Sequence, residues 1–138
     1  MIHDKDYIIR IVKQFSEMIA SMLLGKNEGE PAEEELVFET RLRDVFKMSL
    51  EELTAMSTTE LNSWVEARDA GHRVALYELL GNLFFYCFRN APSPDLAAKA
   101  KHFMELWLQE SKIFSLPVTA RLGEIQKYLE NPEAPFPS

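Results

Sequence analysis

The most apolar part of the chain is the stretch VALYELLGNLFFYCFR, residues 74–89. Its second half, Leu83 to Phe88, is apolar on every side of a helix, which is typical of a helix surrounded by other helices. Glu78 and Asn82 interrupt the apolar run, and the run falls short of the roughly 20 residues that a membrane span requires. The stretch therefore predicts a central, buried helix and no transmembrane segment.

Residues that interrupt helices flank this stretch on both sides. Upstream, Ala70-Gly71 is expected to weaken the preceding helical pattern, because glycine costs about 1 kcal/mol in a helix interior. Downstream, Asn90-Ala91-Pro92 ends the central helix, and Ser93-Pro94-Asp95 begins the next one with an N-cap, a first-turn proline and an acid. The helix that follows is expected to turn Lys99 outward, opposite its apolar face.

Apolar residues recur at helical spacing in the rest of the chain as well. We expect helices over about 4–24, from Pro31 to about Met48, between the capping boxes Ser49/Glu52 and Ser57/Glu60, after Ser57, and over about 117–129. These elements predict an all-α fold, an antiparallel array of about six or seven helices forming one domain over residues 1–130. Pro132, Pro135 and Pro137 predict an extended, mobile tail over residues 131–138.

The composition restricts the classes of partner. The 138 residues include 15 Lys and Arg against 22 Asp and Glu, a net charge of −7, which repels phosphate backbones and anionic lipids. Neither a nucleic acid nor a membrane is therefore expected as a partner. Cys87 is the single cysteine, and its lack of a disulfide partner favours a reducing compartment, so the cytoplasm is the expected location.

No motif in the sequence carries recognisable catalytic chemistry. The glycines stand singly, without a phosphate-binding loop or a nucleophile elbow. The histidines at positions 3, 72 and 102 are too scattered to form a local metal motif. Cys87 lies in the most apolar segment, where a thiol is unreactive. We therefore predict a protein that is not an enzyme, with no catalytic residue, no metal site and no cofactor.

A polar stripe runs along the central helix and provides the main pointer to function. It comprises Glu78, Asn82, Phe85, Tyr86 and Arg89, at steps of one, three and four residues. On a helix otherwise suited to burial, something must receive its polar groups. The stripe would face solvent, satisfy hydrogen bonds between helices, or line a groove that binds a protein segment. The groove is the candidate partner-binding site.

Two other features are candidates for a contact surface. Trp64, Arg68 and His72 share one helix face at steps of four residues, and Trp with Arg often marks a contact hot spot, although a core Trp beside a surface Arg gives the same pattern. Five acids at positions 28, 30, 33, 34 and 35 would contact a basic partner, or lie in solvent and complement the helix dipole.

The hairpin from Val74 to Leu108 resembles a tetratricopeptide-type helix pair. The similarity rests on Tyr77, Leu80-Gly81 and Phe84 in the first helix and Ala97, Ala100 and Phe103 in the second. It implies a tetratricopeptide-like C-terminal half, in which Ala75, Glu78, Asn82, Phe85 and Tyr86 occupy positions of the concave peptide-binding face. The chain also resembles an uncharacterised family of small bacterial all-helical proteins, through residues 6–10 and 112–115. That resemblance implies a bacterial source and a tetratricopeptide-like fold, and it brings no known activity.

The sequence as a whole favours a non-catalytic protein–protein interaction module of a bacterial cytoplasm. Its partner would be a protein segment bound along the polar stripe. One alternative is a structural homo-oligomer, in which the apolar surface of the first helix or of Trp107 is buried against its own copy. Another is a small-molecule-binding helical protein, because helical bundles can form sites between helices that no local motif reveals.

Overall fold

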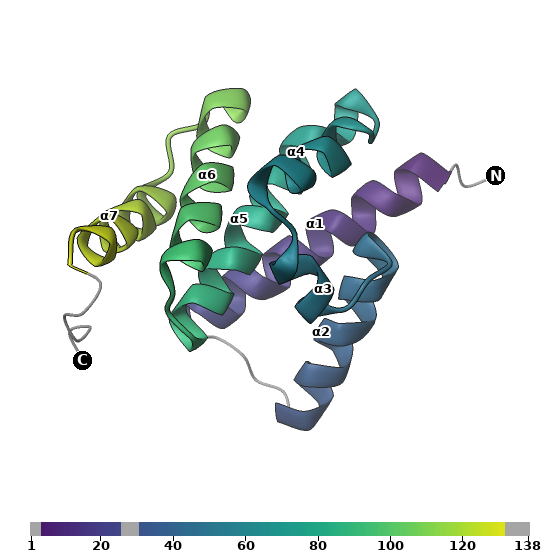
Figure 1. Cartoon of the computed structure of the whole chain (residues 1–138). Helices are drawn as coiled ribbons and strands as arrows, with labels where there is room; N and C mark the ends of the chain where they lie inside the picture. Colours follow the sequence, from purple (N-terminus) through teal and green to yellow (C-terminus); the bar gives the residue numbers. More distant parts are fainter. Residues whose placement is uncertain (1–3, 26–30, 132–138) are drawn as a thin grey trace.

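The computed structural model describes residues 4–25 and 31–131, and every element of regular secondary structure within them is a helix (Figure 1). The elements are α1 (Asp4–Leu23), α2 (Pro31–Phe46), α3 (Leu50–Ala55), α4 (Thr58–Glu66), the 3-10 turn η1 (Ala70–His72), α5 (Arg73–Asn90), α6 (Pro94–Ser111) and α7 (Leu116–Glu130). The all-α expectation is confirmed. The expected tail lies outside the described residues, except for Asn131.

Serine side chains fix where several helices begin. The Ser49 and Ser57 hydroxyls each accept a hydrogen bond of 3.1 Å, from the backbone amides of Glu52 and Glu60 respectively. Each glutamate carboxylate accepts a hydrogen bond from the serine backbone amide in return, which completes two capping boxes. Ser93 caps α6 in the same way through its hydroxyl. These starts were readable from the sequence because capping is a local interaction.

The ends of two helices differ from the expected ones. α2 ends at Phe46, two residues before Met48, because Lys47 adopts a left-handed backbone with φ of 59° that stops the helix. α4 ends at Glu66, and the expected weakening near Ala70-Gly71 is a full break filled by η1.

α5 is the central helix, as its apolar sequence predicts. In Figure 1, α6 lies in front of α5 and antiparallel to it, while α1 crosses behind. Ten of the thirteen α5 residues from Leu76 to Phe88 are buried. The hairpin of α5 and α6 is tight at Gly81, where an added Cβ would lie 2.8 Å from Cγ of Met104. The tetratricopeptide likeness of this hairpin remains a prediction.

Lys99 on α6 is buried, against the expectation that it faces solvent. The residue is 3% exposed, and its ammonium donates to the Thr54 carbonyl oxygen and to Asp95, both at 2.8 Å. The ammonium is satisfied because it meets the last turn of α3, which residue spacing within α6 does not reveal. This contact holds α3 against α6.

Candidate functional site

Asn82, in the middle of the polar stripe, lies at the junction of α1, α5 and α7. It is 6% exposed. Its amide nitrogen donates to Ser16 on α1, at 3.0 Å from the hydroxyl and 3.3 Å from the carbonyl oxygen. Its amide oxygen accepts a hydrogen bond of 2.9 Å from Arg121 on α7. This buried amide therefore has partners on two other helices, as a buried polar group requires.

Phe85, one turn further along α5, is fully buried between two arginines. The guanidinium carbon of Arg89 lies 4.7 Å from the ring centroid, and that of Arg121 lies 5.6 Å away, both within cation–π distance. Arg89 also donates to the Leu23 carbonyl oxygen at 3.1 Å and forms an ion pair with Glu124 at 3.3 Å. These contacts join the end of α5 to α1 and α7.

Glu78 begins the stripe and is half-buried. Burial raises the pKa of its carboxyl above the usual 4.5, whereas a hydrogen bond with Ser16 and the positive charges of Lys13 and Arg121 act in the opposite direction. The carboxyl therefore belongs to the same polar junction as Asn82.

The expectation that the five stripe residues together line one open groove needs correction. Asn82 and Phe85 are covered, and Arg89 is held in contacts with α1 and α7. The physical reason is that α1 and α7 both place polar side chains against this side of α5. Of the stripe, Tyr86 is the residue that reaches a surface pocket.

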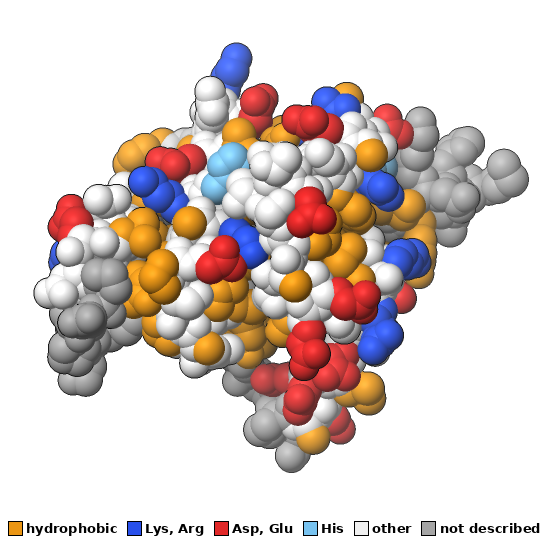
Figure 2. All heavy atoms as spheres, in the orientation of Figure 1, with side chains coloured by type: hydrophobic (Ala, Val, Ile, Leu, Met, Phe, Trp, Pro, Cys, Tyr) orange, Lys and Arg blue, Asp and Glu red, His pale blue; other side chains and the backbone are white. Residues whose placement is uncertain are grey.

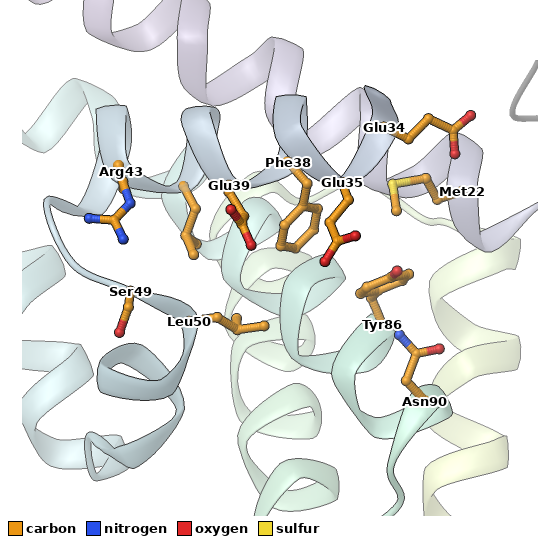
Figure 3. Close-up of a pocket in the computed structure, with 11 residues that line it drawn as sticks. Met22, Glu34, Glu35, Phe38, Glu39, Arg43, Ser49, Leu50, Tyr86 and Asn90 are labelled. Atoms are coloured by element: carbon orange, nitrogen blue, oxygen red, sulfur yellow. The ribbon is translucent and has the colours of Figure 1, made fainter. Parts of the chain in front are cut away.

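The pocket at Tyr86 lies between α2 and α5 and has a volume of about 550 Å³ (Figure 3). Phe38 from α2 and Tyr86 from α5 meet at its base, with ring centroids 5.6 Å apart. Met22 and Leu50 add apolar surface from α1 and α3. The complete lining is Met22, Glu34, Glu35, Phe38, Glu39, Leu42, Arg43, Ser49, Leu50, Tyr86 and Asn90. Four helices thus build one hollow with an apolar base; we call it the α2–α5 pocket.

Carboxylates surround the apolar base of the α2–α5 pocket. Glu34, Glu35 and Glu39 line it, against one cation, Arg43. Figure 3 shows the carboxylates of Glu35 and Glu39 extending from α2 into the space that faces α3 and α5, with Arg43 at the opposite end from Asn90. In Figure 2, acidic side chains gather over the part of the molecule where α2 lies in Figure 1. The pocket therefore combines an apolar base with a mainly acidic rim.

A second hollow, of about 800 Å³, lies between the first half of α1 and the α4–η1 segment. Trp64, Arg68 and His72 all line it, although they do not share a helix face as their spacing predicts, because α4 ends at Glu66 and His72 belongs to η1. The guanidinium carbon of Arg68 lies 4.6 Å from the Trp64 ring centroid. Trp64 also contacts the buried Phe46 at 5.0 Å between centroids. The Trp64 ring therefore packs against a core residue and also lines the surface hollow.

Neither hollow brings together a recognisable catalytic set. Among the described residues, no group of three or more His, Cys, Asp or Glu side chains is placed to hold a metal ion. Burial raises the pKa of the Cys87 thiol to about 11, which keeps it protonated at neutral pH. What the two hollows offer is apolar contact area with charges at the edge, and this arrangement suits binding.

Comparison with models of known families, with curated proteins and with solved structures finds no match to the chain. Within residues 4–25 and 31–131, no helix has the length and apolar character needed to cross a membrane.

Proposed function

We propose that the protein is a non-catalytic protein–protein interaction module of the cytoplasm that binds a segment of a partner protein in the α2–α5 pocket. One observation carries the proposal: the Phe38 and Tyr86 rings, 5.6 Å apart, form the apolar base of a surface pocket. Aromatic residues are enriched where proteins contact one another, because they bury a large area at small cost in side-chain entropy.

The distribution of polar groups favours a protein segment over a small molecule. A small-molecule site buries most of its ligand and fixes it with polar groups that converge inside the cavity. Here Glu35, Glu39 and Arg43 are exposed at the rim, and the base is apolar. An apolar centre with a solvated polar rim is the arrangement of a protein interface.

Selection from a library of displayed random peptides tests this function. Peptides enriched on the wild-type protein are expected to bind Tyr86→Ala at least about tenfold more weakly, since truncating an aromatic anchor removes 1.4 kcal/mol or more. Tyr77→Ala is the matched control, because Tyr77 is a half-buried tyrosine of the same helix that stacks on Phe103 and lies outside the pocket. Equal loss with both variants, or no enriched peptide, would reject the proposal.

A structural homo-oligomer is the second candidate, and it has its own supporting observation. Ile113 and Phe114, between α6 and α7, and Leu116, the first residue of α7, are 55%, 78% and 70% exposed. Exposed apolar side chains so close in sequence are candidates for burial against a second copy. Analytical ultracentrifugation compares the oligomeric state of the wild type and of Phe114→Ser. A dimeric wild type and a monomeric variant would support this candidate, and a monomeric wild type would reject it.

A further inference from the structure

The rim of the α2–α5 pocket carries an excess of negative charge on one helix. Glu35 and Glu39 are both exposed and stand one turn apart on α2, so their carboxylates are neighbours along the edge of the apolar base. Glu34 adds a third carboxylate to the lining, and the whole chain carries a net charge of −7. A cationic partner is therefore attracted both from a distance and at the rim.

We propose that the segment bound in the α2–α5 pocket is a basic amphipathic segment of a partner protein, and this rests on the function proposed above. Its apolar side chains contact Phe38 and Tyr86, while its Lys or Arg side chains pair with Glu35 and Glu39. An acidic segment would place like charges at the rim, which weakens binding.

The two ends of the α2–α5 pocket differ in charge, because Arg43 lies at one of them. Figure 3 places Arg43 and Ser49 at one end and Tyr86 and Asn90 at the other, with Glu35 on the side of Tyr86. The bound segment therefore carries its basic residues beside Glu39 and Glu35, on the side of Arg43 that leads toward Tyr86. Its uncharged or acidic residues lie toward Arg43, because a cation beside the Arg43 guanidinium would be repelled.

Three synthetic peptides test the inference. They share one set of Leu residues at helical spacing and differ only in carrying Lys, Gln or Glu at the remaining positions. Binding is measured by fluorescence anisotropy on the whole protein at low and high salt. The Lys peptide is expected to bind at least about tenfold more tightly than the Gln peptide, and added salt is expected to reduce this advantage, because rim charges are screened.

Two charge-reversal variants locate the effect. Glu35→Lys with Glu39→Lys is expected to remove the advantage of the Lys peptide. Glu105→Lys with Glu110→Lys changes the net charge equally at exposed positions of α6 outside the pocket, and is expected to retain most of it. Circular dichroism of both double variants establishes that the helices are intact.

The outcomes separate the inference from the function beneath it. If all three peptides bind equally well and Tyr86→Ala weakens each of them, the pocket binds segments but the charge inference is wrong. If the Lys peptide still binds more tightly than the Gln peptide to the double variant with Glu35→Lys and Glu39→Lys, its basic residues bind elsewhere. The inference is then also wrong. If none of the peptides binds and the peptide library yields none either, the proposed function itself fails.

Discussion

Asn82 on α5 accepts a hydrogen bond of 2.9 Å from the guanidinium of Arg121 on α7, 39 positions further along the chain. The same amide donates to Ser16 on α1, 66 positions earlier. All three residues are at most 8% exposed. A polar contact inside the protein therefore joins three helices, and its members depend on one another for hydrogen bonds.

Replacement of Asn82 by Ala is expected to lower the free energy of unfolding by about 1–3 kcal/mol, because the buried Arg121 guanidinium loses its hydrogen bond to the amide oxygen and Ser16 loses the amide donor. Urea denaturation measures the change. Asn90→Ala, on the exposed end of the same helix, is the control and should change stability by less than about 0.5 kcal/mol. A neutral Asn82→Ala would mean that Asn82 faces solvent.

Gly81→Ala and Gly123→Ala form a matched pair of helix substitutions. Both gain helix propensity, but the new Cβ at position 81 would lie 2.8 Å from Cγ and 3.3 Å from the backbone nitrogen of Met104, whereas position 123 is open. We expect Gly81→Ala to be less stable than Gly123→Ala by about 1–3 kcal/mol, the cost of overpacking. Equal thermal stability of the two variants would show that α5 and α6 are further apart than this 2.8 Å distance requires.

The capping box at Ser57 makes stability depend on pH. The Ser57 backbone amide donates to the Glu60 carboxylate and lowers its pKa below 4.5. Because the folded pKa is depressed, the contribution is present above the unfolded pKa and is lost as pH falls through the folded pKa. Glu60→Gln should therefore flatten the rise in unfolding free energy between acid and neutral pH. An unchanged pH profile would contradict the capping role of the carboxylate.

Glu78 is expected to make stability depend on pH in the opposite direction to Glu60. Burial raises its folded pKa above 4.5, so its contribution to stability is full below the unfolded pKa and is lost as pH rises through the folded pKa. Glu78→Gln should remove this loss, and the variant should gain stability relative to the wild type on going from pH 4 to pH 7. Urea titrations at the two pH values measure it. A wild type that gains more than the variant would contradict the prediction.

Cys87 should resist thiol reagents while the protein is folded. Burial raises its pKa to about 11, and the residue is 8% exposed. At pH 8 the thiolate fraction is then at least about 100-fold smaller than that of an ordinary cysteine with a pKa near 8.5. We expect Ellman's reagent to react rapidly in denaturant and at least about 100-fold more slowly without it. Comparable rates would place Cys87 at the surface.

The limits of helices and the identity of the central helix were predictable because their causes are local. Capping boxes at Ser49 and Ser57 join residues three positions apart, and the proline and serine at the start of α6 act on its first turn. The boundary at Lys47 was missed, since a left-handed backbone at a lysine has no sequence signal comparable to glycine.

An all-helical fold with a central helix over about residues 74–89 could be predicted from the sequence, because helix period, caps and apolar content are properties of neighbouring residues. Tertiary packing determines which residues of the polar stripe are buried and which one lines a surface pocket. Ser16 and Arg121 cover Asn82 and Phe85, while Tyr86 meets Phe38 at an open pocket. A helix that is apolar on nearly every side does not encode which side a distant helix will cover, since that choice depends on how all the helices pack together.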